Sequence, residues 1–150
     1  MHAAIKLADE GVASGRGGPF GCVIVRAGTI VGRGSNRVTS SHDPTAHAEV
    51  VAIRDACAQL KTFQLADCEL YTSCEPCPMC LAAIYWARIP SVYYGNTRGD
   101  AAAAGFDDDF IYRQVPLPPE KRAIKMTPLL REAAQATFTA WARKSDKVRY

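Results

Sequence analysis

The sequence predicts an α/β fold in which helices cover both faces of a mixed sheet. Short runs rich in branched and aromatic residues alternate along the chain with longer segments of helical periodicity. The chain has 150 residues, of which 48% are hydrophobic and 22% charged, enough apolar material for one domain with its own core. No internal repeat or low-complexity stretch interrupts this pattern, so we expect residues 1–150 to form a single domain.

The first part of the chain predicts a short helix followed by a hairpin. Apolar residues recur along one side of residues 3–13, at Ile5, Ala8 and Val12. Residues 20–25 and 30–36 then form two antiparallel strands around a turn at 27–29. Glycines within these strands often mark the close approach of another backbone or a ligand, with turns and bulges as the alternative: Gly21, Gly32 and Gly34.

The middle of the chain predicts two helices with a strand between them. After a polar loop at residues 37–45, four apolar residues repeat at helical spacing and predict a buried face: Val50, Ile53, Cys57 and Leu60. Residues 68–73 are rich enough in branched and aromatic side chains to be a strand. Residues 77–87 are apolar on every side of a helix, including Leu81, Tyr85 and Trp86, which predicts that this helix is buried all round.

The last third of the chain is less regular. Residues 92–95 predict a fourth strand, 100–104 a helical turn and 113–123 a polar loop. Residues 124–130 alternate enough to be a fifth strand, and Pro128 places that strand at an edge. A C-terminal helix follows, ending in a charged tail at 143–150. The expected sheet is therefore mixed and five-stranded.

Two motifs carry the ligands that zinc prefers, His47-Ala48-Glu49 and Cys74-Glu75-Pro76-Cys77-Pro78-Met79-Cys80. Cys77 and Cys80 are three residues apart and share one face of a helix. His47 and Glu49 are two apart, so His47 must stand at a helix start, where the backbone is not yet helical. His47, Cys77 and Cys80 thus predict a Zn2+ site whose open position holds a water that ionises near neutral pH, with Glu49 as proton carrier.

Other metal sites are possible with the same residues. Cys74 could close the zinc site as a fourth ligand and make it structural. An iron–sulfur cluster is a further alternative, but the run has no fourth cysteine after Cys80. The remaining cysteines, Cys22, Cys57 and Cys68, are expected to be small buried hydrophobes.

Charge and cysteine content limit the classes of partner. Six cysteines without a secretory leader predict a reducing compartment, so we expect a cytoplasmic protein, and no run is long enough to span a bilayer. The net charge of +3 is only mildly basic, whereas dedicated nucleic-acid binders usually have a denser basic patch. A nucleic-acid partner is therefore not expected.

These elements and motifs resemble the cytidine-deaminase-like fold, three α/β/α layers around a five-stranded sheet, over nearly the whole chain. The zinc motifs are shared by that superfamily. Within it, the chain is similar to the bacterial guanine deaminases, above all in the run Gly105-Phe106-Asp107-Asp108-Asp109-Phe110-Ile111-Tyr112. The resemblance implies zinc-dependent hydrolysis of guanine, a free base, to xanthine and ammonia.

The resemblance also implies roles for individual residues. Asp108 would hold the leaving amine or assist the second proton transfer, with helix capping as the alternative. Asn36 would offer a donor and an acceptor to the purine edge, with a turn-forming role as the alternative. Phe20 and Trp86 would stack on the base, unless they belong to the core. Tyr150 would end a segment, residues 143–150, that closes over the pocket and is exchanged between the subunits of a homodimer, with an exposed disordered tail as the alternative.

Three other functions remain open at this point. A transfer-RNA adenosine deaminase shares the zinc motifs and acts on a flipped-out nucleotide, and Lys144, Lys147 and Arg149 could form its basic rim. A deaminase of another small aminated ring, such as cytosine or a triazine, would use the same site. In a non-enzymatic zinc module, Glu49 would be incidental.

Overall fold

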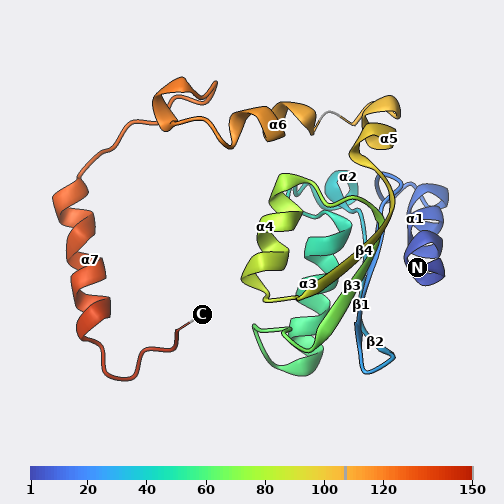
Figure 1. The fold of residues 1–150 in the computed structure, drawn as a ribbon, viewed down its shortest axis with the longest axis horizontal. Coiled ribbons are helices and arrows are strands. Elements are labelled where there is room, and N and C mark those ends of the chain that lie inside the picture. Colours follow the sequence, from blue (N-terminus) through green and yellow to red (C-terminus); the bar gives the residue numbers. More distant parts are fainter. Residues whose placement is uncertain (107, 150) are drawn as a thin grey trace.

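A computed structural model describes residues 1–106 and 108–149, whose core is a three-layer arrangement of helices on both faces of a sheet (Figure 1). The sheet has the strand order β2-β1-β3-β4, with β1 antiparallel to β2 and β3, and β3 parallel to β4. The strands span Gly21–Arg26 (β1), Thr29–Ser35 (β2), Cys68–Cys74 (β3) and Ser91–Asn96 (β4). This confirms the predicted α/β class with a mixed sheet.

The predicted fifth strand at residues 124–130 is wrong, because the described part of the chain forms a sheet of four strands. Residues 124–130 lie in a segment that leaves the body after β4 (Figure 1). A strand exists only where a neighbouring backbone supplies hydrogen-bond partners. Alternation in the sequence does not show whether such a neighbouring backbone exists. Without a fifth strand beside it, β4 is an edge strand of the sheet.

Helices pack on the sheet through its glycines. Helix α1 (His2–Ala13) lies against β1, where a Cβ atom at Gly21 would stand 2.1 Å from the carbonyl oxygen of Ala4. On the other face, α3 (Ala48–Leu60) lies against β2, where a Cβ at Gly34 would stand 2.1 Å from the carbonyl oxygen of Ala48. The prediction of a close backbone approach is therefore confirmed.

This packing changes which helix faces are buried. Helix α1 buries Ala4, Ala8 and Gly11, whereas the expected Ile5 and Val12 are exposed. Helix α3 buries its small residues, Ala48, Ala52 and Ala56, whereas the expected face is half-buried: Val50, Ile53, Cys57 and Leu60. Glycine on the strands leaves room for alanine on the helices but not for larger side chains.

The core lies between the sheet and α3 with α4 (Pro78–Trp86). It contains Ile24, Leu65 and Leu70, together with Cys22 and Cys68, which confirms these two cysteines as buried. Cys57 is only half-buried.

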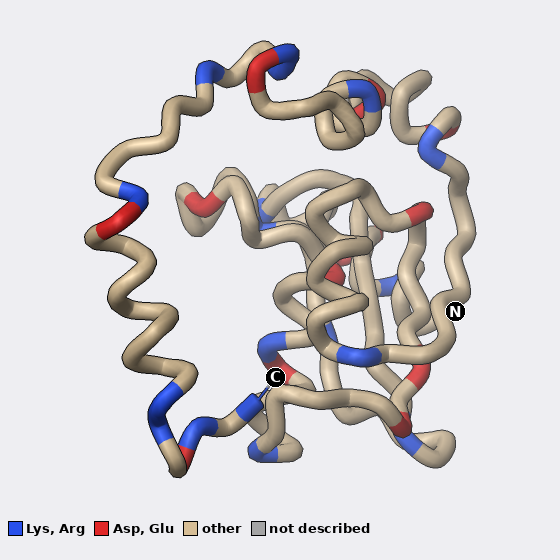
Figure 2. Tube along the Cα trace, turned by 60° about the vertical axis from the view of Figure 1, so that its left-hand side comes forward, with Lys and Arg blue, Asp and Glu red and all other residues tan. Residues whose placement is uncertain are grey.

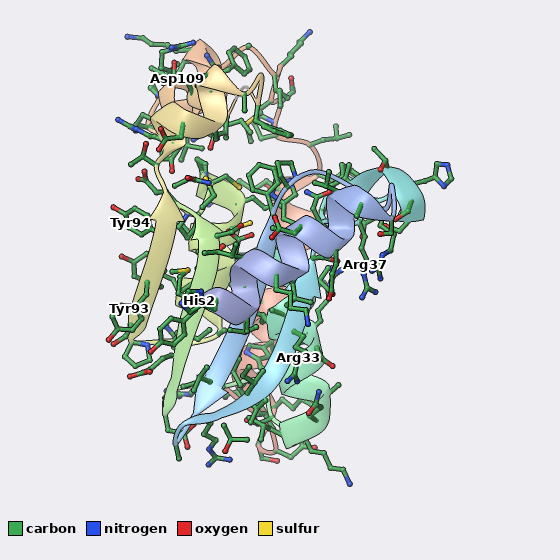
Figure 3. The ribbon with its side chains drawn as sticks, turned by 90° about the vertical axis from the view of Figure 1, so that its right-hand side faces the viewer. His2, Arg33, Arg37, Tyr93, Tyr94 and Asp109 are labelled. Atoms are coloured by element: carbon green, nitrogen blue, oxygen red, sulfur yellow. The ribbon has the colours of Figure 1, made fainter. Side chains whose placement is uncertain are left out.

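Helix α4 is not buried on every side, and that prediction is wrong for the single chain. Its inner face buries Cys80 and Ile84, but Leu81, Tyr85 and Trp86 are 39%, 70% and 62% exposed. Two further aromatic residues, Tyr93 and Tyr94, are exposed on the edge strand β4 (Figure 3).

The remaining helices are short or lie outside the layers. Helix α2 (Val38–Ser41) is a single turn after β2, and α5 (Arg98–Ala103) follows β4. Residues 108–149, here called the C-terminal arm, contain α6 (Asp109–Gln114), a 3-10 turn (Pro119–Lys121) and α7 (Arg131–Arg143). Every residue of α7 is exposed, and α7 stands apart from the sheet (Figure 1). None of the helices described in the chain is long and apolar enough to cross a membrane.

Candidate active site

Two helix N-termini bring the predicted metal ligands together. His47 is the N-cap residue of α3 and Cys77 that of α4, and both have extended backbone conformations. This confirms that His47 stands at a helix start. The Sγ atoms of Cys77 and Cys80 lie 3.6 and 3.5 Å from Nδ1 of His47, and one ligand atom from each residue lies within 4.8 Å of the others. The three side chains can therefore converge on one ion.

The chemistry of this donor set fits zinc. The hydrogen bond from the Cys80 thiol lowers the pKa of Cys77 to about 4, so Cys77 is readily a thiolate. The hydrogen bond to Cys77, together with burial, raises the pKa of Cys80. The hydrogen bond to Cys77 raises the pKa of His47. A divalent cation would displace the thiol protons of this group, and two thiolates with one imidazole form a typical catalytic zinc set.

Cys74 is not part of this group. Its Sγ lies 3.6 Å from the carbonyl oxygen of Thr97, and burial raises the pKa of its thiol to about 11. A protonated thiol directed at a backbone carbonyl is a poor zinc ligand. This geometry favours a site with three protein ligands over the closed structural site.

Glu49 lies in the first turn of α3, two residues after the histidine. It is only 6% exposed, and burial raises the pKa of its carboxyl group. Its Oε1 accepts a hydrogen bond of 3.2 Å from the hydroxyl of Thr72 on β3, which orients the carboxyl group. Burial favours the protonated form of a carboxyl group, so Glu49 holds a proton more readily than a free glutamate and can pass it to a substrate.

A cavity of about 260 Å³ opens beside the metal ligands. The predicted residues that line it are Phe20, Asn36, His47, Glu49, Cys77 and Asp108. Asp108 occupies the N-cap position of α6 but makes no side-chain capping hydrogen bond, and burial raises the pKa of its carboxyl group. Three carboxyl groups therefore line the cavity: Glu49 on α3, Glu75 in the loop before Cys77, and Asp108 on the C-terminal arm.

The wall of the cavity includes an aromatic pair. The rings of Phe20 and Phe106 meet edge to face, with centroids 4.7 Å apart and planes at 77°. Such a pair is stabilising and holds the ring of Phe20 in a fixed orientation. Phe20 is half-buried and lines the cavity, where it can contact a flat ligand.

The side chain of Asn36 is oriented by the backbone around it. Its Oδ1 accepts hydrogen bonds from the N–H groups of Gly18, at 3.3 Å, and Val38, at 3.2 Å. Two N–H donors require the oxygen at that position, so the amide orientation is determined. The NH2 group is left to donate to a ligand. The sequence predicts that Asn36 offers a ligand both a donor and an acceptor, whereas the structure leaves only the donor.

One predicted substrate contact among the described residues, Trp86, does not line this cavity. Trp86 lies on the exposed side of α4, beside Trp141 and residues 147–149 of the arm. Tyr150 lies outside the described residues. Stacking by Trp86 is not supported by this chain's own cavity, and closure by Tyr150 stays a prediction.

Sequence patterns did not identify three residues that shape the site. Thr72 orients Glu49, Phe106 holds Phe20, and Gly18 binds the oxygen of Asn36. The only available signal was for Phe106, which belongs to the distinctive run at residues 105–112. Thr72 and Gly18 act across the fold, so local spacing does not reveal them.

Known proteins resemble this chain over different shares of its length. Residues 1–96 match the family described as "Cytidine and deoxycytidylate deaminase zinc-binding region". Guanine deaminase of Bacillus subtilis is 54% identical over all of this chain and 96% of its own length. Its X-ray structure has a TM-score of 0.96 and covers 99% of this chain and 95% of that chain.

Two more distant relatives differ in their substrates. A structure of guanine deaminase from Nitrosomonas europaea is 32% identical, with a TM-score of 0.69, over 93% of this chain and 80% of that chain. A tRNA-specific adenosine deaminase of Agrobacterium fabrum is 44% identical, but over only 58% of this chain and 59% of its own length.

Proposed function

Because the chain belongs to the cytidine and deoxycytidylate deaminase zinc-binding family, we propose that it deaminates free guanine by hydrolysis. Water adds to the ring carbon that carries the exocyclic amine, the bond from that carbon to nitrogen breaks, and xanthine and ammonia are released. The observation that supports this best is a single cavity lined by two of the zinc-type ligands, His47 and Cys77, and by the two carboxyl groups with raised pKa values, Glu49 and Asp108. Similarity to guanine deaminases over the whole chain supports the choice of substrate.

The two carboxyl groups divide the proton transfers. Zinc held by His47, Cys77 and Cys80 would supply an acidic water at its open position. Glu49, beside the metal ligands, carries a proton on its carboxyl group and delivers it to a ring nitrogen next to the attacked carbon. Asp108, across the cavity, holds the leaving amine and assists its second protonation.

Asn36 favours guanine over adenine. Guanine presents two neighbouring acceptors, O6 and N7, whereas adenine presents an amino donor next to N7. The NH2 group of Asn36 can donate to O6 of guanine, where adenine has an amino donor, and its own oxygen is already bound by Gly18 and Val38. The cavity volume of about 260 Å³ is below the roughly 300–1,000 Å³ of drug-sized ligand sites, which suits a free base.

A folded RNA is a weaker candidate. Lys and Arg are scattered over the body and the arm, interspersed with Asp and Glu (Figure 2). In the tail, Lys144 pairs with Asp146 at 2.6 Å, which reduces the positive charge there. Nucleic-acid binding depends on a dense positive surface facing the phosphates.

Ammonia release tests the proposed function. The purified, zinc-loaded protein is given guanine, adenine, cytosine, guanosine or unmodified transfer RNA. We expect rapid release from guanine and little from the others. Ammonia release from RNA alone would show that the protein is a transfer-RNA deaminase. Release from none of these substrates would favour a zinc module without catalysis.

We also propose that the active form is a homodimer in which the C-terminal arms are exchanged. The arm carries apolar side chains that its own body leaves exposed, such as Leu129 and Phe138, at 81% and 69%. The body offers an apolar groove of about 600 Å³ between α3 and α4, lined in part by Ile53, Phe63 and Trp86. Large apolar surfaces on both parts of one chain are typical of an interface between copies.

A mixing experiment tests the exchange. One chain carries Glu49→Gln and keeps Tyr150, and the other keeps Glu49 and lacks Tyr150. If each tail closes the partner's site, subunits mixed after reversible dissociation regain activity that neither variant has alone. No recovery in mixed dimers that light scattering confirms would mean that each tail serves its own chain.

A further inference from the structure

Tyr112 links the C-terminal arm to the metal-ligand loop. Its hydroxyl group donates a hydrogen bond of 2.9 Å to the carbonyl oxygen of Pro76. Pro76 is buried and directly precedes Cys77, one of the predicted metal ligands. The bond therefore joins α6 to the backbone that positions the metal ligands.

Asp108 stands one helical turn before Tyr112. The carbonyl oxygen of Asp108 accepts hydrogen bonds from the N–H groups of Ile111, at 2.9 Å, and Tyr112, at 3.1 Å. A helical turn is rigid relative to the loops around it. The hydrogen bond at the Tyr112 hydroxyl therefore fixes the position of the whole helical turn, and with it the position of the Asp108 carboxyl group beside the cavity.

A second contact holds the ring of Tyr112. The guanidinium carbon of Arg98 lies 5.0 Å from the ring centroid, within the range of a cation–π interaction. The backbone N–H of Arg98 in turn donates to Oε2 of Glu75, at 3.0 Å. Both contacts of Tyr112 therefore lead to the same loop, at Glu75 and Pro76.

After Tyr112 the chain moves away from the body. The side-chain hydrogen bonds described for the next segment stay within the arm, as from the N–H of Ala123 to Gln114 and from Arg122 to Leu117. Figure 3 shows α6, where Asp109 is labelled, beyond the end of the sheet, so the helix needs an anchor to stay over the cavity. Tyr112 lies at this point of departure.

We propose that Tyr112 is a positioning residue that holds Asp108 over the metal site while the rest of the arm leaves the body. Tyr112 does not line the cavity and acts through Asp108. The inference rests on the proposed function, in which Asp108 assists loss of the amine. The arm then has a fixed part, residues 108–112, and a second part, residues 113–149, that is free to reach another surface.

Tyr112→Phe removes only the hydroxyl group and is the first test. We expect kcat for guanine to fall about tenfold, the effect of one hydrogen bond, with KM and zinc content unchanged. Tyr71→Phe is the matched control, because it removes a hydroxyl that donates to Glu69, at 2.8 Å, on β3. The control should keep full kcat.

A double-mutant cycle with Asp108→Asn separates positioning from a general structural effect. If Tyr112 acts through Asp108, adding Tyr112→Phe to Asp108→Asn causes little further loss of kcat. If the two losses multiply, Tyr112 does not act through Asp108 and the inference is wrong.

Hydrogen exchange provides a readout that does not need turnover. The amides of Ile111 and Tyr112 should exchange faster in Tyr112→Phe than in the unaltered protein, and at equal rates in Tyr71→Phe. Unchanged exchange in Tyr112→Phe would overturn the anchor whatever the substrate is. Absence of guanine turnover in the unaltered protein would instead overturn the proposed function, while faster exchange would still support the anchor.

Discussion

The hydroxyl of Thr72 donates a hydrogen bond of 3.2 Å to a carboxyl oxygen of Glu49, and both side chains are buried. Thr72→Val keeps the shape of the side chain and removes this donor. The free energy of unfolding should fall by about 1–3 kcal/mol, because a buried acceptor loses its partner, and kcat should fall about tenfold. Urea denaturation and steady-state kinetics measure the two effects. Thr72→Ser keeps the hydroxyl and should lose much less kcat; equal losses in both variants would show that shape matters, not the bond.

Glu49→Gln should abolish proton transfer while leaving the fold intact. Glutamine matches the size of glutamate but cannot carry the proton, so kcat should fall by at least about two orders of magnitude. Zinc content, measured by atomic absorption, should remain at that of the unaltered protein. Loss of zinc in this variant would give Glu49 a structural role instead.

Cys77→Ala should remove the metal. Two remaining ligands, His47 and Cys80, are too few for a stable zinc site. Zinc per chain should therefore drop sharply after dialysis against a weak chelator. Cys57→Ala is the control, because Cys57 lies half-buried on α3 outside the ligand group, and it should retain zinc. Full zinc in Cys77→Ala would contradict the ligand assignment.

Asn36→Asp should weaken the preference for guanine. The substitution keeps an oxygen for the N–H groups of Gly18 and Val38 but replaces the NH2 donor by an acceptor. We expect kcat/KM for guanine to fall about 10- to 100-fold, the effect of losing one hydrogen bond and leaving polar groups unpaired. The melting temperature should change little. An unaltered ratio of guanine to adenine turnover would mean that Asn36 does not select the base.

The capping box of α5 should make part of the stability pH-dependent. The N–H and hydroxyl groups of Thr97 donate to Oδ2 of Asp100, at 2.8 and 2.7 Å, and these hydrogen bonds lower the pKa of that carboxyl group. Because the folded pKa lies below the unfolded value of about 3.8, the stabilisation is complete above that value and is lost as the pH falls through the folded pKa.

Thr97→Val removes the hydroxyl donor and tests this linkage. The pKa of Asp100, followed by NMR titration of its carboxyl carbon, should rise toward its ordinary value. The pKa of Asp67, which the hydrogen bond from Arg26 lowers, should not change and serves as the internal control. A constant pKa for Asp100 would remove Thr97 as the cause.

The metal ligands could be predicted from the sequence because their geometry is local. The spacing of Cys77 and Cys80, and the helix start at His47, depend only on helical geometry and its prolines. Features that depend on distant partners were not predictable. The segment at 124–130 alternates like a strand but pairs with no strand in the described part of the chain, and Trp86 lies on the exposed side of an otherwise apolar helix.

The buried face of α3 also differs from the face that its apolar periodicity predicts. Large residues such as Ile53 set the apolar periodicity in the sequence, yet the contact surface consists of alanines, because the strand beneath carries Gly32 and Gly34. The glycines on the strand indicate this face, since small residues on one element predict small residues on the element packed against it.

The packing of α3 on glycine also affects how the protein can evolve. At Gly32 and Gly34 the helix approaches β2 so closely that an added Cβ atom would meet it, so small residues hold this spacing at the contact. Substitutions at positions such as Leu70 can accumulate and be compensated elsewhere in the core without displacing the helix start that carries His47. Catalytic geometry and core composition are thereby free to diverge at different rates among descendants of this sequence.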